Sequence, residues 1–187
     1  MRINTIGATY LMVGAILAAF VAVLVAVVRM TSASAQNVEG AAAALIQPVV
    51  ALVVLTAIVG FMMVVYRNVA LIRGKASGLY FKTFTADMPA EWVERPTRTY
   101  MNLLELPVLF YVACLLMLTT GRFDSVQVSL AWVFVISRYV HAFIYIGFNY
   151  VPLRFAAFLA GVFTLAVIWT RFAEQNPNWH LLVGATS

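Results

Sequence analysis

The stretch AAALIQPVVALVVLTAIVGFMMVVY, residues 42–66, contains no charged residue and is long enough to cross a lipid bilayer. A membrane-spanning α-helix needs about 20 predominantly apolar residues in succession. Similar apolar runs occur on both sides of this stretch, at residues 8–28, 100–119, 126–148 and 153–171. The last three are joined by short links, which is typical of antiparallel neighbours in a helical bundle. The pattern predicts an all-α membrane protein with about five transmembrane helices.

The composition agrees with this prediction. Hydrophobic residues make up 64% of the 187 residues and charged residues only 10%, whereas a soluble domain carries about 25% charged residues. The formal net charge is +5, but the basic residues lie in loops and at helix ends. Orientation in the bilayer and contact with anionic lipid headgroups explain them better than nucleic acid does. The single cysteine, Cys114, excludes an intrachain disulfide framework.

The chain divides into an extra N-terminal transmembrane helix with its loop, residues 1–40, and a four-helix membrane domain, residues 41–187. The sequence Ala-Ser-Ala at residues 33–35 resembles a signal-peptide cleavage site, so an uncleaved or cleaved signal segment is the alternative for the first part. The polar segment 67–98 mixes basic and aromatic residues. It is interpreted either as lying at the headgroup level or as a solvated loop whose aromatic residues pack on the bundle end. Its positive charge predicts a cytoplasmic location, in the inner membrane of a bacterium.

Polar side chains recur on one face of each of the last three predicted helices, at spacings of three, four or seven residues. They are Arg98, Asn102 and Glu105, then Arg138, His141 and Tyr145, and finally Arg154. A charge in the middle of the bilayer costs at least about 2.5–3.5 kcal/mol, so these groups should converge inside the bundle or between subunits. They could simply hold the helices together. Three arginines against one glutamate, however, leave a positive surplus that favours a bound anion. No cluster has the spacing of metal ligands, so no metal site is expected.

The same residues resemble the signature of the MAPEG family, the membrane-associated proteins of eicosanoid and glutathione metabolism. Residues 94–105 read E-R-x-x-R-x-x-x-N-x-x-E, with a proline at 107, and residues 138–145 read R-x-x-H-x-x-x-Y, with Arg154 nine residues later. The second segment is similar to the microsomal glutathione transferase and prostaglandin E synthase branch. Phe155 stands where prostaglandin synthases have a serine, so the resemblance does not carry that specific activity.

The resemblance implies a four-helix bundle that forms a homotrimer and binds glutathione between subunits near the cytoplasmic face. It implies that glutathione is bound by Arg98, Asn102, Glu105, Arg138, His141 and Tyr145. Arg154 matches the catalytic arginine that stabilises the glutathione thiolate, since a fixed cation beside sulfur favours the reactive anion. The expected function is a glutathione transferase or peroxidase that acts on apolar electrophiles arriving through the membrane lipid.

Two other functions stay open. One is a non-enzymatic relative that binds a lipid or another membrane protein with the same bundle. The other is a structural membrane subunit in which the first helix, residues 8–28, docks a membrane-protein partner.

Overall fold

The computed structural model describes residues 38–83 and 88–176, and its regular elements are all helices. These are α2 (Val38–Ile72), α3 (Gly78–Thr83), α4 (Glu91–Thr120), α5 (Ser125–Ile146) and α6 (Val151–Glu174). The four long helices are each long and apolar enough to span a membrane. The chain is a multi-pass integral membrane protein, as predicted. The first of the five predicted helices, residues 8–28, lies outside the described residues.

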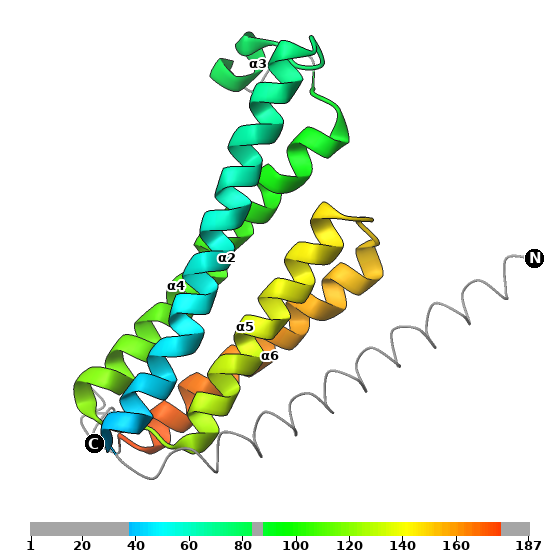
Figure 1. The fold of residues 1–187 in the computed structure, drawn as a ribbon. Helices are drawn as coiled ribbons and strands as arrows, with labels where there is room; N and C mark the ends of the chain where they lie inside the picture. The colour runs from blue at the N-terminus through cyan, green and yellow to red at the C-terminus, as the bar shows by residue number, and fades with distance from the viewer. Residues whose placement is uncertain (1–37, 84–87, 177–187) are drawn as a thin grey trace, which may run out of the picture.

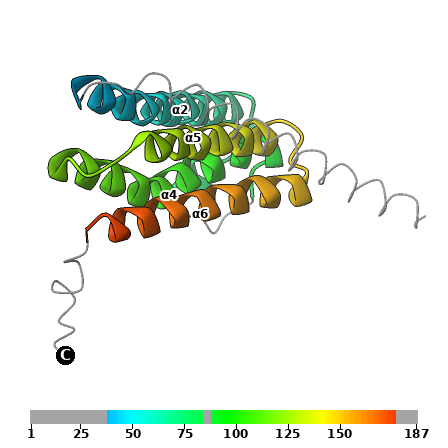
Figure 2. The same cartoon turned by 90° about the horizontal axis from the view of Figure 1, so that it is seen from below.

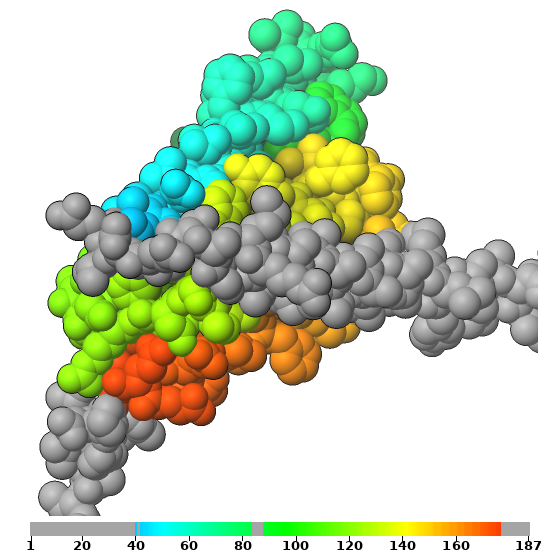
Figure 3. Space-filling model, turned by 60° about the horizontal axis from the view of Figure 1, so that its bottom comes forward, coloured from blue at the N-terminus to red at the C-terminus, as the bar shows by residue number. Residues whose placement is uncertain are grey.

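The four long helices run alongside one another with alternating direction (Figure 1). Helices α4 and α5 lie between α2 on one side and α6 on the other, because α2 packs on α4 and α5, and α6 packs on α5 and α4 (Figure 2). On the face drawn in Figure 3, α2, α5 and α6 are all visible, in cyan, yellow and orange. The predicted four-helix bundle is therefore confirmed.

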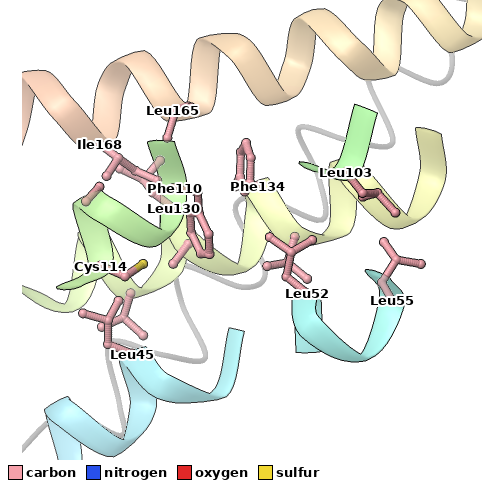
Figure 4. Packing of buried hydrophobic residues seen from close by; sticks show 14 of the residues in the cluster. Leu45, Leu52, Leu55, Leu103, Phe110, Cys114, Leu130, Phe134, Leu165 and Ile168 are labelled. Carbon is pink, nitrogen blue, oxygen red and sulfur yellow. The ribbon is translucent and has the colours of Figure 1, made fainter. Parts of the chain in front are cut away.

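The bundle core is a layer of apolar side chains contributed by all four helices (Figure 4). The Phe110 and Phe134 rings stack with their centroids 4.7 Å apart, and Cys114 is a buried packing residue in the same cluster. Many large apolar side chains point outward instead, among them Phe61 at 71% and Phe143 at 73% exposure. Lipid is the natural solvent for such a surface, and helices in lipid associate through close packing rather than through the hydrophobic effect.

Helix α4 begins at Glu91 rather than near residue 100, where its apolar run starts. Its charged first two turns are supported by pairs at i,i+4 spacing, Glu91 with Arg95 and Glu94 with Arg98, an arrangement that stabilises a helix. Hydropathy therefore marks the part of the helix that can lie in lipid, and the helix itself extends further.

The end of α4 and the start of α5 are defined by specific capping groups. Gly121 ends α4 in the left-handed conformation, with φ at 64°, which suits a residue without a Cβ atom. The Asp124 carboxylate accepts a hydrogen bond from the Gln127 backbone N–H at 2.9 Å, and the Gln127 side chain accepts one from the Asp124 N–H at 3.1 Å. This capping box satisfies two backbone donors at the start of α5.

The polar segment 67–98 is mostly helical, since it contains the end of α2, all of α3 and the start of α4. Its aromatic side chains pack back on the bundle end: the Tyr66 and Trp92 rings lie 5.7 Å apart, and the Arg67 guanidinium lies 5.2 Å from the Phe81 ring centroid. These contacts are the ones expected if the aromatic residues of the segment pack on the bundle end. The depth of the segment relative to the lipid headgroups stays a prediction.

Candidate functional site

A concave pocket of about 360 Å³ opens at the end of the bundle where α4 begins and the α5–α6 link passes. Its volume lies in the range of small-molecule sites, about 300–1,000 Å³. It is lined by Met88, Pro89, Glu91, Glu94, Arg95, Arg98, Tyr145, Asn149, Val151 and Arg154. Three of the predicted site residues, Arg98, Tyr145 and Arg154, come together here from three different helices.

The wall formed by α4 carries two cations and two carboxylates. Arg95 pairs with Glu91 at 3.1 Å and also donates to the Gly147 carbonyl at 2.6 Å, which ties α4 to the end of α5. Arg98 is held more loosely, 3.8 Å from Glu94, with 53% of its side chain exposed. The Arg98 guanidinium therefore has donors available to a ligand.

Glu94 has a second neighbour outside the membrane-spanning helices. The phenol of Tyr80 in α3 hydrogen-bonds to this carboxylate, and burial together with Glu94 raises the pKa of Tyr80 above its usual value. Tyr80 thus stays a neutral donor near neutral pH and helps to hold Glu94 at the pocket wall.

The opposite wall is built around Arg154, in the first turn of α6. The Arg154 guanidinium lies 4.0 Å from the centroid of the Tyr145 ring and donates to the Asn149 amide oxygen at 2.6 Å. The Asn149 amide nitrogen in turn donates to Glu91 at 2.8 Å. Within the described residues Arg154 has no carboxylate partner, so its charge is available to a bound anion.

Asn149 is a site residue that the sequence analysis missed. It lies in the α5–α6 link with φ at 48°, a left-handed conformation that asparagine tolerates better than most residues. This conformation lets its amide reach both Arg154 and Glu91. An asparagine just before the Val151-Pro152 start of a membrane helix was the available signal.

Two predicted site residues, Arg138 and His141, are not among the pocket residues. Arg138 is only 2% exposed and donates to the Ala157 and Phe158 carbonyls of α6, both at 3.1 Å. The His141 Nδ1 atom is 3.1 Å from the Arg154 carbonyl oxygen. Both side chains therefore bond to the backbone of α6, and their contact with glutathione stays a prediction.

The other two predicted residues lie further along α4. The Asn102 amide donates to the Arg98 carbonyl at 3.0 Å, and Glu105 is exposed. Glu105 forms no ion pair with any residue in the described part of the chain. The predicted pairing of Glu105 with an arginine is thus not made between the described helices of one chain, and an arginine of another subunit stays the expected partner.

The pocket combines three arginines with two glutamates, which leaves one positive charge in excess. Such a site can bind an anion and stabilise developing negative charge at one side of it. Among the described residues, no three His, Cys, Asp or Glu side chains converge in a way that could hold a metal ion.

Comparison with known proteins supports the relationship that the motifs indicated. The model of the MAPEG family matches residues 45–173, which includes all four long helices in large part and both motifs. No curated protein and no solved structure matches the chain.

Proposed function

Because the chain belongs to the MAPEG family, whose membrane proteins include glutathione transferases and related enzymes, we propose that it binds glutathione in the pocket between α4 and the α5–α6 link. The observation that carries this proposal is Arg154. Its guanidinium lies against the Tyr145 ring at the pocket wall and has no carboxylate partner in the described chain. Members of the family commonly use glutathione, and a thiolate is the anion that such an arginine would stabilise.

The charges of the pocket match the groups of glutathione, which has two carboxylates, one ammonium group and one thiol. Arg98, loosely held and half exposed, supports binding of a carboxylate. Glu91 and Glu94 offer acceptors for the ammonium group. Arg154 on the opposite wall favours the ionised thiol, because an adjacent cation lowers a thiol pKa.

The proposed reaction is nucleophilic attack by the glutathione sulfur on an apolar electrophile. In a transferase reaction the new bond joins sulfur to the electrophilic carbon, and the leaving group departs with the electron pair of the broken bond. With a peroxide, sulfur attacks one oxygen, the O–O bond breaks, and the other oxygen leaves as the alcohol or water. The resulting glutathione sulfenic acid then reacts with a second glutathione, which forms the disulfide and releases water. Arg154 would contribute in both cases by keeping the sulfur anionic.

We further propose that the working form is a homotrimer in which a second copy covers the outer face of α4. Glu105 is exposed midway along this membrane-spanning helix. A charge of this kind facing lipid costs at least about 2.5–3.5 kcal/mol. A neighbouring subunit that supplies a cation to Glu105 would remove this cost and would also bring Asn102 and Glu105 into a site between subunits.

The test is glutathione binding by the detergent-purified protein, measured by calorimetry, followed by conjugation of chlorodinitrobenzene. Wild-type protein is expected to bind glutathione and to accelerate the conjugation. Arg154→Met should abolish most of the acceleration, whereas Arg122→Met, which removes an arginine from the opposite end of the bundle, should not. Wild-type protein that does not bind glutathione would disprove the proposal, and binding without turnover would favour the non-enzymatic alternative.

A further inference from the structure

The charged side chain most deeply buried in the bundle is Arg138, and the pocket does not use it. It is 2% exposed in the middle of α5, and no carboxylate in the described chain pairs with it. A buried charge without partners costs several kcal/mol, so its surroundings must compensate for the lost water. The way in which they do so points to a role for this residue.

The hydrogen bonds and ring contacts of the Arg138 guanidinium in the described chain are made with one turn of α6 and with neighbouring residues of α5, including Ser137, whose Oγ atom accepts from the Arg138 Nε at 3.3 Å. Its Nη2 atom donates to the Ala157 and Phe158 carbonyls, and its Cζ atom lies 5.4 Å from the Phe134 ring centroid and 5.6 Å from that of Phe158. These distances are within the range of cation–π attraction. The guanidinium therefore bonds to the backbone of α6 itself.

The Arg138 guanidinium occupies space that the missing side chain of Gly161 leaves free. A Cβ atom at Gly161 would overlap the Arg138 Nη2 atom and would come within 2.7 Å of both the Arg138 Cζ and the Ser137 Oγ atoms. If α6 rotated about its axis by one residue, the side chain of an adjacent α6 residue would fill the space beside the guanidinium that Gly161 leaves free. The close approach of Arg138 to Gly161 therefore disfavours rotation of α6 away from its observed position.

The same rotational position presents Arg154 to the pocket. Arg154 precedes Gly161 by seven residues, which is about two helical turns, so the two lie on nearly the same face of α6. On α5, Tyr145 follows Arg138 by the same seven residues. The antiparallel helices thus make two contacts two turns apart, Arg138 with Gly161 and Tyr145 with Arg154.

We propose that Arg138 and Gly161 form a helix lock that sets the rotation of α6 and so holds the Arg154 guanidinium over the Tyr145 ring in the pocket. Arg138 is then a positioning residue that acts through α6, a role that replaces the direct glutathione contact implied by the family resemblance. This inference rests on the proposed function only where it concerns the glutathione thiol. The lock itself is a property of the protein without ligand.

The first test is a stability cycle on the ligand-free protein in detergent, with Arg138→Met, Gly161→Ala and the double variant. In Gly161→Ala the guanidinium is pushed from its carbonyl acceptors while still buried, so the melting temperature should fall. The methionine of Arg138→Met leaves space for the new methyl group, so the double variant should melt no lower than Arg138→Met alone. Distant sites would show additive losses instead, and additivity overturns the lock. Gly40→Ala, where nothing lies near the added methyl group, is the glycine control.

The second test asks whether the lock positions α6. Spin labels replace Phe143 on α5 and Phe155 on α6, two outward-facing residues, and their distance is measured by double electron–electron resonance in protein diluted with unlabelled chains. Arg138→Met should shift or broaden the distance distribution, and Arg138→Lys, which keeps a donor for the α6 carbonyls, should restore much of it. An unchanged distribution in Arg138→Met contradicts the positioning role even if glutathione proves not to bind.

The third test uses glutathione and is expected to separate positioning from binding. Arg138→Met should raise the pKa of the bound thiol by about one unit, because a displaced Arg154 guanidinium stabilises the thiolate less. At a pH where the thiol is protonated in both proteins, the dissociation constant for glutathione should change less than about threefold. A large loss of affinity with an unchanged thiol pKa would show that Arg138 touches the ligand and would overturn the proposal. Arg73→Met, an exposed arginine at the end of α2, is the charge control.

Discussion

Replacing Arg154 with methionine is expected to raise the pKa of the bound glutathione thiol without abolishing binding. Methionine keeps an unbranched side chain that can still cover the Tyr145 ring, so the substitution removes the charge more than the packing. The other pocket cations, Arg95 and Arg98, remain in place to hold the carboxylates.

The size of the effect follows from the geometry of the pocket wall. The Arg154 Cζ atom is 4.0 Å from the Tyr145 ring centroid, and a sulfur atom in contact with the guanidinium would lie at about the same distance. Two opposite charges about 4 Å apart attract by about 4 kcal/mol at an effective dielectric constant near 20. The pocket is open to solvent, so part of this attraction is screened. A shift of about two pKa units, or about 2.7 kcal/mol, is the expected size.

The sign of the pH dependence is set by this shift. A cysteine-type thiol ionises near pH 8.5, so a two-unit decrease gives a bound thiol with a pKa of about 6.5. At pH 7 the wild-type complex would then be mostly thiolate and the variant mostly thiol, which predicts a loss of turnover of about 25-fold. Near pH 10 both proteins hold the thiolate, so the difference in thiolate content should vanish.

The assay is the ultraviolet absorbance of the thiolate at saturating glutathione, titrated from pH 5 to 10, with conjugation rates measured at the same pH values. Arg122→Met is the matched control because this side chain lies at the opposite end of the bundle and, within the described residues, donates to the Gln175 carbonyl. An equal titration in wild type and Arg154→Met, or a rate loss that is the same at all pH values, would refute the reasoning and leave Arg154 as an anchor for α6.

Three further outcomes are expected. Glu105→Ala should reduce the trimer fraction in native mass spectrometry more than Leu104→Ala does, since both side chains are exposed on α4 and only one is charged; equal effects would count against the subunit contact. Asp124→Ala should lower the unfolding free energy by about 1–2 kcal/mol through loss of the α5 cap, with little from its half-exposed ion pair, and Asp124→Asn should recover most of it in detergent melts. Cysteines placed at Lys75 and Ser125 should be labelled from opposite sides of sealed vesicles, and labelling from the same side would disprove the assigned topology.

The sequence predicted the four described membrane helices because apolar length is a strong signal in a membrane protein. It predicted their ends less well. The first two turns of α4 are charged, and a hydropathy criterion assigns them to a loop although the pairs from Glu91 to Arg95 and from Glu94 to Arg98 support a helix. The i,i+4 spacing of these charges is visible in the sequence and could have placed the start of α4 correctly.

Periodicity identified the polar face of α5 but not what covers it. Arg138, His141 and Tyr145 do lie on one face, and that face packs against α6, so that only Tyr145 reaches the pocket. Helix α6 packs on this face at Gly161, where the missing side chain leaves space for the Arg138 guanidinium. The role of this glycine depends on which atom lies next to it in the fold, and that atom cannot be identified from one sequence.

The position of the pocket bears on how two dissimilar substrates could meet. Its α4 wall belongs to the charged turns that precede the apolar part of the helix, so a water-soluble tripeptide anion would have access from that end. On the α6 side, Val151 and Phe155 lie near Arg154 in the sequence and are 56% and 58% exposed, which would give an apolar molecule in the lipid a surface next to the guanidinium. Since a thiolate stabilised at Arg154 would lie between these two surfaces, the electrophile would not need to leave the lipid boundary to react. The charge of Arg154 would then act at the one level of the bundle that both substrates can reach.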